Sequence, residues 1–383
     1  MIFNDKLKDF LFGSLFFFGA LFPACGQEHQ STTIDRETAT VAAPDSISHD
    51  TLLAELPVEK SVKIIGVGDM MLGTNYPSTS YLPPNGGKDL LVEVREILKS
   101  ADVTFGNMEG AILDSGGTPK SCKNPDVCYV FRSPESYIQH FIDAGFDVVS
   151  IANNHSGDFG AVGRAKTKEV LKKANIQFAG LAGTDEFAIF EKNGIKYGFC
   201  AFAPNSGTVD IRNISKARQI VSRLAEETDI VIVSFHGGAE GSQHQRMTRK
   251  TEYYYGENRG NVYEFAHAVV DAGADVVFGH GPHVTRAAEL YKDRFIIYSM
   301  GNFCTYGRFS LSGEAGIAPI VELEVSPEGA FLGGRIIPIY QQKTHGPKID
   351  AQKRAIKTLS NLTRQDFPET SLLIDEEGNL LKK

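Results

Sequence analysis

The chain has 383 residues, of which 42% are hydrophobic, and a formal net charge of -8 at pH 7. It is long enough to bury one large core or two of ordinary size. The acidic balance excludes an extended nucleic-acid-binding surface, because such surfaces need clustered Lys and Arg. Five cysteines are too few for a disulfide scaffold, and no Cys-x-x-Cys pattern predicts a zinc knuckle.

Residues 1–25 have the features of a signal for export. A weakly basic start is followed by an apolar run from Phe10 to Phe22, shorter than the ~20 residues that a membrane-spanning helix needs. The sequence Ala24-Cys25-Gly26 resembles a bacterial lipoprotein box, so we expect lipidation of Cys25 and attachment to a membrane of the cell envelope. An ordinary signal peptide with a chance cysteine is the alternative. Residues 26–60 are rich in Ser, Thr, Glu and Ala and predict a flexible tether.

The folded part is predicted to cover residues 61–342 and opens with two strands that end in polar residues. The apolar run Val62–Val67 ends in Gly68-Asp69. After a helix predicted over residues 88–100, the strand Asp102–Phe105 leads to Asn107 and Glu109. Carboxylates at strand ends, beside glycines that permit close approach of the backbone, are candidate metal ligands.

A loop rich in Gly, Ser, Pro and Lys follows at residues 115–124 and is predicted to lie on the surface. Cys122 and Cys128 either pair in an oxidising compartment or remain two free thiols. Arg132 is a candidate for bidentate binding of an anionic substrate, although a surface arginine before the helix predicted over residues 134–144 is the commoner case.

The most informative stretch runs from residue 148 to residue 160. The apolar strand Val148–Ile151 gives way to Asn153, Asn154, His155 and Asp158. These side chains place amide oxygens, an imidazole and a carboxylate at the carboxyl edge of a sheet, where open α/β folds hold ligands. A polar turn that satisfies only its own backbone is the alternative.

The same arrangement recurs along the rest of the chain, where helices predicted over residues 162–174, 215–227 and 261–272 alternate with apolar strands. The strands near 229–235, 275–278 and 294–298 end in His236 and Glu240, His280 and His283, and Asn302. The combined set contains oxygen and nitrogen donors and no thiolate, which favours Mn, Zn, Fe or Mg over a structural zinc site. We therefore predict a ligand-binding or catalytic cleft at these strand ends.

Two further strands, at residues 320–325 and 331–339, are predicted around the turn Ser326–Gly329. Residues 343–383 are predicted as a tail with one short helix near residues 351–362 and no visible chemistry.

The strand-end motifs resemble a known family when they are read in order. They are Gly-Asp-x-Met-Leu-Gly, Gly-Asn-x-Glu-Gly, Ala-Asn-Asn-His-x-x-Asp-x-Gly, His-Gly-Gly-x-Glu, Gly-His-Gly-Pro-His-Val and Ser-x-Gly-Asn-Phe. Together they resemble the CapA family of bacterial capsule proteins, which is associated with poly-γ-glutamate synthesis or export and belongs to the calcineurin-like metallophosphoesterase superfamily. The resemblance covers residues 62–340. It implies an α/β fold, a four-layer α/β/β/α sandwich of metallophosphoesterase type, with the metal site at the strand ends.

The resemblance also implies roles for individual residues. The metal-ligand positions, for one or two divalent ions, are Asp69, Glu109, Asn154, His236 and His283, with Glu109 near the place of the bridging carboxylate. His155 matches the histidine that donates a proton to the leaving group, and Asp158 and Glu240 are predicted to assist catalysis. Arg132, Asn153, His280 and Asn302 are predicted to contact substrate.

Three positions depart from the pattern of many metallophosphatases. Met71 stands where they have a histidine, and Asn107 stands where they have an aspartate. His280 and His283 are three residues apart rather than two. These departures put a complete two-metal centre in question.

Two functions are consistent with these residues. The first is an exported, metal-dependent hydrolase in the synthesis of a capsule or another cell-surface polymer, acting on a phosphoester or a γ-glutamyl amide. Its substrate would be an anionic polymer or a small phosphorylated molecule. The alternative is a non-catalytic capsule-assembly or export factor that binds an anionic polymer and membrane partners such as capsule synthase proteins.

Overall fold

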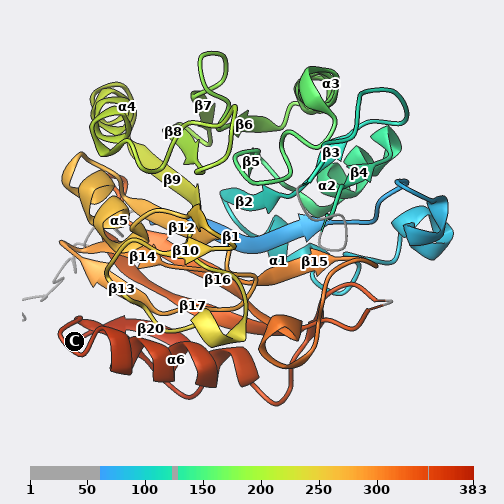
Figure 1. The fold of residues 1–383 in the computed structure, drawn as a ribbon. Coiled ribbons are helices and arrows are strands. Elements are labelled where there is room, and N and C mark those ends of the chain that lie inside the picture. Colours follow the sequence, from blue (N-terminus) through green and yellow to red (C-terminus); the bar gives the residue numbers. More distant parts are fainter. Residues whose placement is uncertain (1–60, 123–127, 344) are drawn as a thin grey trace, which may run out of the picture. The chain divides into compact units, whose positions relative to one another are not determined.

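The computed structural model of the protein describes residues 61–122, 128–343 and 345–383 (Figure 1). The predicted export signal (1–25) with Cys25, and the predicted tether (26–60), lie outside the described residues. No helix within the described part of the chain is both long and apolar enough to cross a membrane.

The larger of two main sheets is built around β1 (Val62–Met71). Its strand order is β19-β20-β17-β16-β1-β2-β5-β6, with β15 also beside β1 and β18 beside β17. β1, β2 and β5 run parallel, and β15 runs parallel to β1, so their carboxyl ends meet at one edge. The other bounds are β2 (Val103–Met108), β5 (Val148–Ser150), β6 (Gln177–Ala179), β15 (Asn302–Thr305), β16 (Ile317–Val325), β17 (Phe331–Tyr340), β18 (Lys348–Ile349), β19 (Leu372–Ile374) and β20 (Asn379–Lys382).

The second sheet has the order β13-β14-β12-β9-β8-β7. Its four inner strands are parallel, which again gathers the carboxyl ends at one edge. The bounds are β7 (Phe187–Lys192), β8 (Ile195–Phe202), β9 (Ile230–His236), β12 (Val276–His280), β13 (Ala288–Tyr291) and β14 (Arg294–Ile297). Two small pairs complete the strands: β3 (Ala111–Ile112) with β4 (Arg132–Ser133), and β10 (Tyr253–Tyr254) with β11 (Glu257–Asn258).

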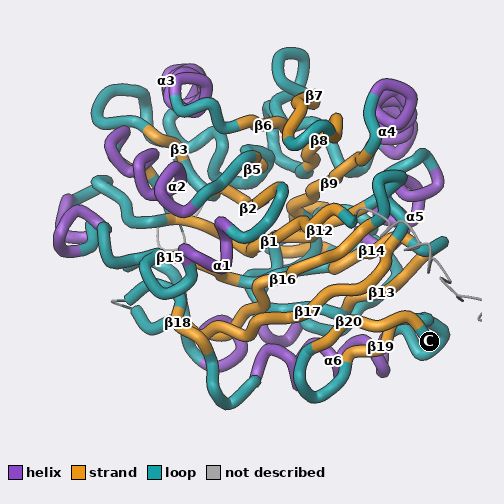
Figure 2. Tube along the Cα trace, turned by 180° about the vertical axis from the view of Figure 1, so that it is seen from behind, coloured by secondary structure: helices purple, strands orange, loops and turns teal. Residues whose placement is uncertain are grey.

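The two sheets pack face to face and each carries helices on its outer side. Between them Phe105 of β2 stacks on Phe278 of β12, with ring centroids 5.1 Å apart. The outer face of the larger sheet packs on α1 (Arg95–Lys99), α2 (Ile138–Ala144) and α3 (Gly160–Lys173), and the outer face of the second packs on α4 (Ile214–Glu227) and α5 (Val262–Asp271). Figure 2 shows these two groups of helices on opposite sides of the strands. The predicted four-layer α/β/β/α sandwich is therefore confirmed.

The C-terminal residues are part of this body. α6 (Arg354–Asp366) contacts β13, β16 and β17, and β19 and β20 extend the larger sheet through β17. The helix buries Ile356, Leu359 and Leu362 on one face, which explains why it packs rather than projecting into solvent. Residues 343–383, which we expected as a tail after a boundary at residue 342, thus continue the same compact unit.

One predicted helix is much shorter in the structure. The apolar spacing in residues 88–100 gives an α-helix only over Arg95–Lys99, and residues 88–94 form turns that bury Leu90, Leu91 and Val94. The preceding Gly86 and Gly87 have positive φ (62° and 80°), so the chain enters this region outside helical geometry. Asn193 and Gly194, a dipeptide typical of tight hairpin turns, both have positive φ and join the antiparallel strands β7 and β8.

Gly68 is the point at which β1 passes close to the loop that leads into β15. A methyl group at this position would collide with the backbone carbonyl of Gly301, and neither backbone is free to move without disturbing the neighbouring Asp69. We expect Gly68→Ala to lower the free energy of unfolding by about 1–3 kcal/mol or more, as overpacked cores do, measured by chemical denaturation. Gly333→Ala is the matched control, since its methyl would meet only Leu380 O at 3.6 Å. Equal stability of both variants would contradict the steric argument.

Candidate metal centre

The polar residues predicted at strand ends come together where the two sheets meet. On the larger sheet Asp69 of β1 is in register with Asn107 of β2 and Asn302 of β15. On the second sheet His236 of β9 is in register with His280 of β12. All five are buried, because parallel strands covered on both faces expose neither side to water.

Asp69 lies at the centre of the cluster and receives contacts from both sheets. Asn107 Nδ2 donates to Asp69 Oδ1 at 2.8 Å, and His280 Nδ1 lies 3.2 Å from the same oxygen. His283 Nδ1 lies 2.9 Å from Asp69 Oδ2. Burial favours the neutral acid, but the hydrogen bonds from the two histidines outweigh it and hold the pKa of Asp69 well below its ordinary value. Asp69 is therefore a carboxylate.

Glu109 and His283 complete a group that could hold a cation. One ligand atom each from Asp69, Glu109 and His283 lies within 4.8 Å of the others. Burial, with help from neighbouring carboxylates, raises the pKa of Glu109 to about 8. Burial opposes the charge on His283, but Glu109 and Asp69 raise its pKa to about 10. His283 has a positive φ of 56°, which turns its ring toward both carboxylates.

Several buried oxygen and nitrogen atoms around this group, which could act as metal ligands, have no hydrogen-bond partner among the described residues. They are both oxygens of Glu109, both ring nitrogens of His236, Nε2 of His280, and the amide oxygens of Asn154 and Asn302. Each unpaired buried group costs about 1–3 kcal/mol, so such a concentration calls for a ligand. Burial lowers the pKa of His236 well below its ordinary value, which leaves the neutral imidazole that metals bind. The donors fit a divalent cation.

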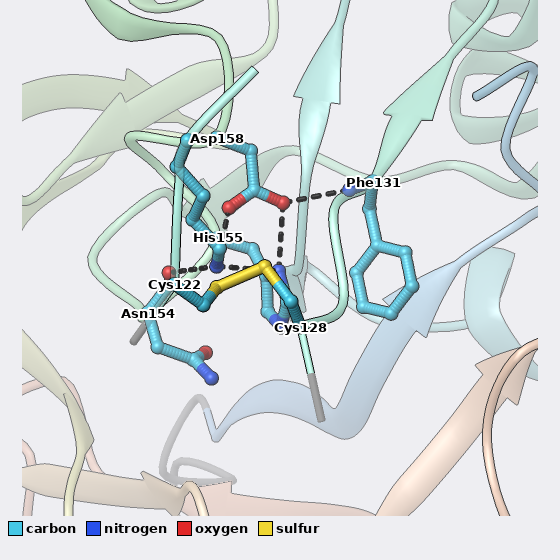
Figure 3. Close-up of a disulfide and its surroundings, with 7 residues drawn as sticks. Cys122, Cys128, Phe131, Asn154, His155 and Asp158 are labelled. Atoms are coloured by element: carbon cyan, nitrogen blue, oxygen red, sulfur yellow. Dashed lines mark hydrogen bonds and ion pairs between the residues drawn. A yellow bond between two sulfur atoms is a disulfide. The ribbon is translucent and has the colours of Figure 1, made fainter. Parts of the chain in front are cut away.

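His155 and Asp158 form a pair at the edge of this cluster (Figure 3). His155 Nδ1 lies 2.7 Å from Asp158 Oδ2, and Nε2 lies 3.9 Å from Glu109 Oε1. Because Nδ1 is engaged by Asp158, Nε2 is the atom that faces the metal cluster. Burial lowers the pKa of His155, while Asp158 opposes that shift. The geometry suits the predicted proton-donating role.

The other predicted residues lie close to the centre but have different partners. Glu240 pairs with Arg259 (Nη1 to Oε1, 3.1 Å), and its side chain is 20% exposed. Asn153 Nδ2 donates to Asn107 Oδ1 and Met108 O of β2, and its Oδ1 accepts from His155 N, so its side chain ties the turn to β2. Asn302 Nδ2 donates to His283 O and Ala315 O, which supports the loop that carries His283.

Arg132, which we predicted to bind an anionic substrate, is engaged elsewhere. Its Nε donates to Asn75 Oδ1 at 2.6 Å, Nη1 donates to Gly116 O at 3.3 Å, and the guanidinium lies over the rings of Tyr76 and Phe159. These contacts hold two loops together. The predicted substrate role of Arg132 remains a prediction.

Two cations near the centre were missed in the sequence. Lys120, in a loop that looked like surface, lies 2.6 Å from Asp158 Oδ1. Arg308 lies between the rings of Tyr81 and Tyr129, at 5.2 and 5.3 Å, and the neighbouring Phe309 ring packs on His283. The two cysteines that follow Lys120 closely in the sequence were an available signal that this loop is held in place. The structure resolves those cysteines, Cys122 and Cys128, as a disulfide.

The fold and the strand-end cluster define an α/β/β/α protein with a candidate metal site of oxygen and nitrogen donors. The chain belongs to the family described as bacterial capsule synthesis protein PGA_cap, whose model matches residues 63–306. This confirms the predicted family.

Curated relatives include proteins of two Bacillus species. The capsule biosynthesis protein CapA of Bacillus anthracis is 29% identical over 262 residues, which cover 62% of this chain and 58% of the relative. The PGA biosynthesis protein CapA of Bacillus subtilis (strain 168) is 26% identical over 252 residues, covering 62% and 61%. The chain thus spans less than two thirds of the length of these relatives. Among solved structures, a putative 5'-nucleotidase from Staphylococcus aureus is 14% identical with a TM-score of 0.44, covering 79% of this chain and 58% of that one.

Proposed function

We propose that this protein is a metal-dependent hydrolase that acts on an anionic substrate during synthesis of a capsule or another cell-surface polymer. The observation that carries the proposal is the set of buried, unpartnered donor atoms around Asp69, beside the His155–Asp158 pair. A purely structural cluster would pair these atoms with one another.

The residues that would hold the metal are Asp69, Glu109, Asn154, His236 and His283. All are oxygen or nitrogen donors, which suit Mn, Zn, Fe or Mg. A divalent ion bound there would supply Lewis-acid activation of a water and of the substrate oxygen. Met71 is buried in the core and Asn107 is bound to Asp69, so these positions do not supply the ligands that a complete two-metal centre requires.

His155 supplies the proton that hydrolysis requires. The P–O bond of a phosphoester or the C–N bond of an amide breaks, the water oxygen bonds to phosphorus or carbon, and the leaving atom takes a proton from His155 Nε2. The proton that the water loses passes to solvent, from which His155 is protonated again. The Asp158 carboxylate, 2.7 Å from Nδ1, opposes the lowering of the His155 pKa by burial and so favours the doubly protonated imidazole from which the proton is transferred. Glu240, which neutralises Arg259, keeps that cation from competing for the carboxylates of the centre.

Both a phosphoester and a γ-glutamyl amide remain candidate substrates. The superfamily resemblance supports the first, and the relation to capsule and PGA biosynthesis proteins of Bacillus supports the second. We further propose that the chain is exported and held at the membrane by lipidated Cys25, close to capsule synthase proteins and their polymer. Metabolic labelling of cells with a radioactive fatty acid would test the lipid anchor.

A screen of the metal-loaded full chain tests the proposed activity. The probes are p-nitrophenyl phosphate, bis-p-nitrophenyl phosphate and γ-glutamyl-p-nitroanilide, each with Mn, Zn, Fe and Mg. We expect turnover of one class that chelation abolishes and readdition of metal restores. A protein that retains metal and hydrolyses none of these, nor poly-γ-glutamate itself, would contradict the hydrolase.

The alternative is a non-catalytic factor that binds an anionic polymer, and Arg308 favours it. Its guanidinium is held between two tyrosine rings, and no hydrogen bond or ion pair from its side chain to a described carboxylate is present. Stacking on aromatic faces fixes the plane of a guanidinium while leaving its N–H edge open for a carboxylate or phosphate.

Arg308→Gln should therefore weaken binding of poly-γ-glutamate by about tenfold, since a hydrogen-bonded charge pair contributes about 1.5–3 kcal/mol. Arg308→Lys should retain part of the affinity because it keeps the charge but not the planar fork. Isothermal titration calorimetry of the full chain measures both. The control is Arg218→Gln, an exposed arginine on α4 at the outer face of the second sheet. Equal losses at both positions would indicate only a general charge effect.

A further inference from the structure

Lys120 contacts three residues of the turn that follows β5 at the candidate centre. Its Nζ lies 2.6 Å from Asp158 Oδ1, donates to the main-chain oxygen of Asn154 at 3.1 Å, and lies 3.5 Å from His155 Nδ1. Its backbone N–H also donates to Asp158 O at 2.8 Å. Only 27% of the Lys120 side chain is exposed, so these contacts are not those of a freely moving surface lysine.

The residues that follow the loop approach the same carboxylate from the other side. Phe131 N donates to Asp158 Oδ2 at 2.6 Å, the oxygen that also faces His155 Nδ1. The Phe131 ring packs on the His155 ring with centroids 4.2 Å apart. Each oxygen of Asp158 is thus held by a different end of the segment between Lys120 and Phe131.

A disulfide joins these two ends. Cys122 follows Lys120 by two residues, Cys128 precedes Phe131 by three, and the two cysteines are bonded to each other beside Asn154 and His155 (Figure 3). We call residues 120–122 and 128–131 the disulfide-linked segment. A covalent link between its ends lowers the entropy that must be lost when both ends are fixed on Asp158.

We infer that Lys120 is a positioning residue of the metal centre and that the Cys122–Cys128 disulfide keeps it in place. The inference rests on the proposed function, because the centre is taken to bind a metal. Lys120 fixes the main chain of Asn154, whose buried amide oxygen is one of the unpartnered donors. Through Asp158 it also fixes the orientation of His155. Residues that support ligands in this way commonly affect metal affinity by about 10–100-fold.

Manganese affinity of the full chain tests the role of Lys120. We expect Lys120→Met to weaken Mn²⁺ binding by about tenfold, because Asp158 loses its cation and Asn154 loses its main-chain contact. Lys120→Arg should recover part of the affinity. The matched control is Lys192→Met. Lys192 ends β7 and its ammonium lies 2.7 Å from Asp147, which directly precedes β5 and so lies at the amino end of that strand, opposite to the candidate centre. Unchanged affinity in Lys120→Met would overturn the inference.

Reduction tests the role of the disulfide. Wild type treated with a reductant, and a Cys122→Ser, Cys128→Ser double variant that needs no reductant, should both bind Mn²⁺ several-fold more weakly than the oxidised wild type. The double variant should not respond further to reductant, since the other cysteines of the described part of the chain, Cys200 and Cys304, are buried free thiols. Equal affinity of oxidised and reduced protein would remove the disulfide from the proposal.

A second measurement does not depend on the metal. In wild type the proton on His155 Nδ1, bound to Asp158, should give a downfield and slowly exchanging NMR resonance, assigned by its loss in His155→Gln. Lys120→Met and the double cysteine variant should speed its exchange. A wild type that binds no metal but shows this behaviour would contradict the proposed function and support the positioning role. Exchange that neither change alters would overturn that role.

Discussion

Asp69→Asn is expected to abolish stoichiometric metal binding while leaving the protein folded. The substitution keeps the shape and the hydrogen bond from Asn107, but it removes the carboxylate toward which His280 and His283 point. Even residues that only support a ligand are worth about 10–100-fold in affinity, so we expect a loss of more than about 100-fold for the ligand itself. Elemental mass spectrometry of the purified full chain measures the metal content directly.

His236→Ala should have a similar effect, since neither ring nitrogen of His236 has a hydrogen-bond partner among the described residues. Two matched controls should retain metal. Asp366→Asn changes a buried aspartate at the end of α6 that pairs with Arg246, and His267→Ala removes a histidine bound to Glu289. A wild type that takes up no Mn, Zn, Fe or Mg under any condition would contradict the proposal that this cluster binds a metal.

His155→Gln is expected to lower kcat by about 100–10,000-fold with metal content unchanged, the range by which general acids accelerate reactions. Glutamine fills most of the space of the imidazole and can still accept or donate a hydrogen bond near Asp158, but it cannot supply a proton. Because His155 is not among the residues we assign to the metal, metal retention separates the loss of acid catalysis from the loss of the site.

Steady-state kinetics on whichever probe the screen identifies would measure this effect. Lys192→Met serves here too as a variant outside the strand-end cluster and should keep wild-type turnover. Wild-type kcat in His155→Gln would exclude it as the acid. Loss of metal together with loss of turnover would instead make His155 part of the metal site.

Much of the site was readable in the sequence because parallel strands impose a simple geometry. An apolar run that ends in Asp69, Glu109, His155 or His236 must present that residue at the carboxyl edge, whatever the loops do. The four-layer arrangement followed from the resemblance. The contacts of Asn107 and His280 with Asp69 depend on strand register, which pairs residues up to 211 positions apart and leaves no local pattern.

The loops account for what the sequence did not predict. Arg132 and Arg308 each adjoin a phenylalanine in the sequence, Phe131 and Phe309, yet Arg132 is tied into loop packing and Arg308 has an open N–H edge. Lys120 was placed in a surface loop because residues 115–124 have the composition of a surface loop. Which loop residue reaches a buried carboxylate is decided by tertiary packing, for which neither periodicity nor turn chemistry provides a signal.

The cluster takes its donors from both sheets. Asp69 lies in β1 and Glu109 just after β2 of the larger sheet, whereas His236 ends β9 and His283 follows β12 of the second. A chain whose sheets had formed but not docked would hold only half a site. A bound ion would therefore act as a clamp across the interface between the sheets, adding about 2.7 kcal/mol to the free energy of unfolding when it is present at 100 times its Kd. The concentration of the ion would then set the stability of the docked sheets as well as the occupancy of the centre.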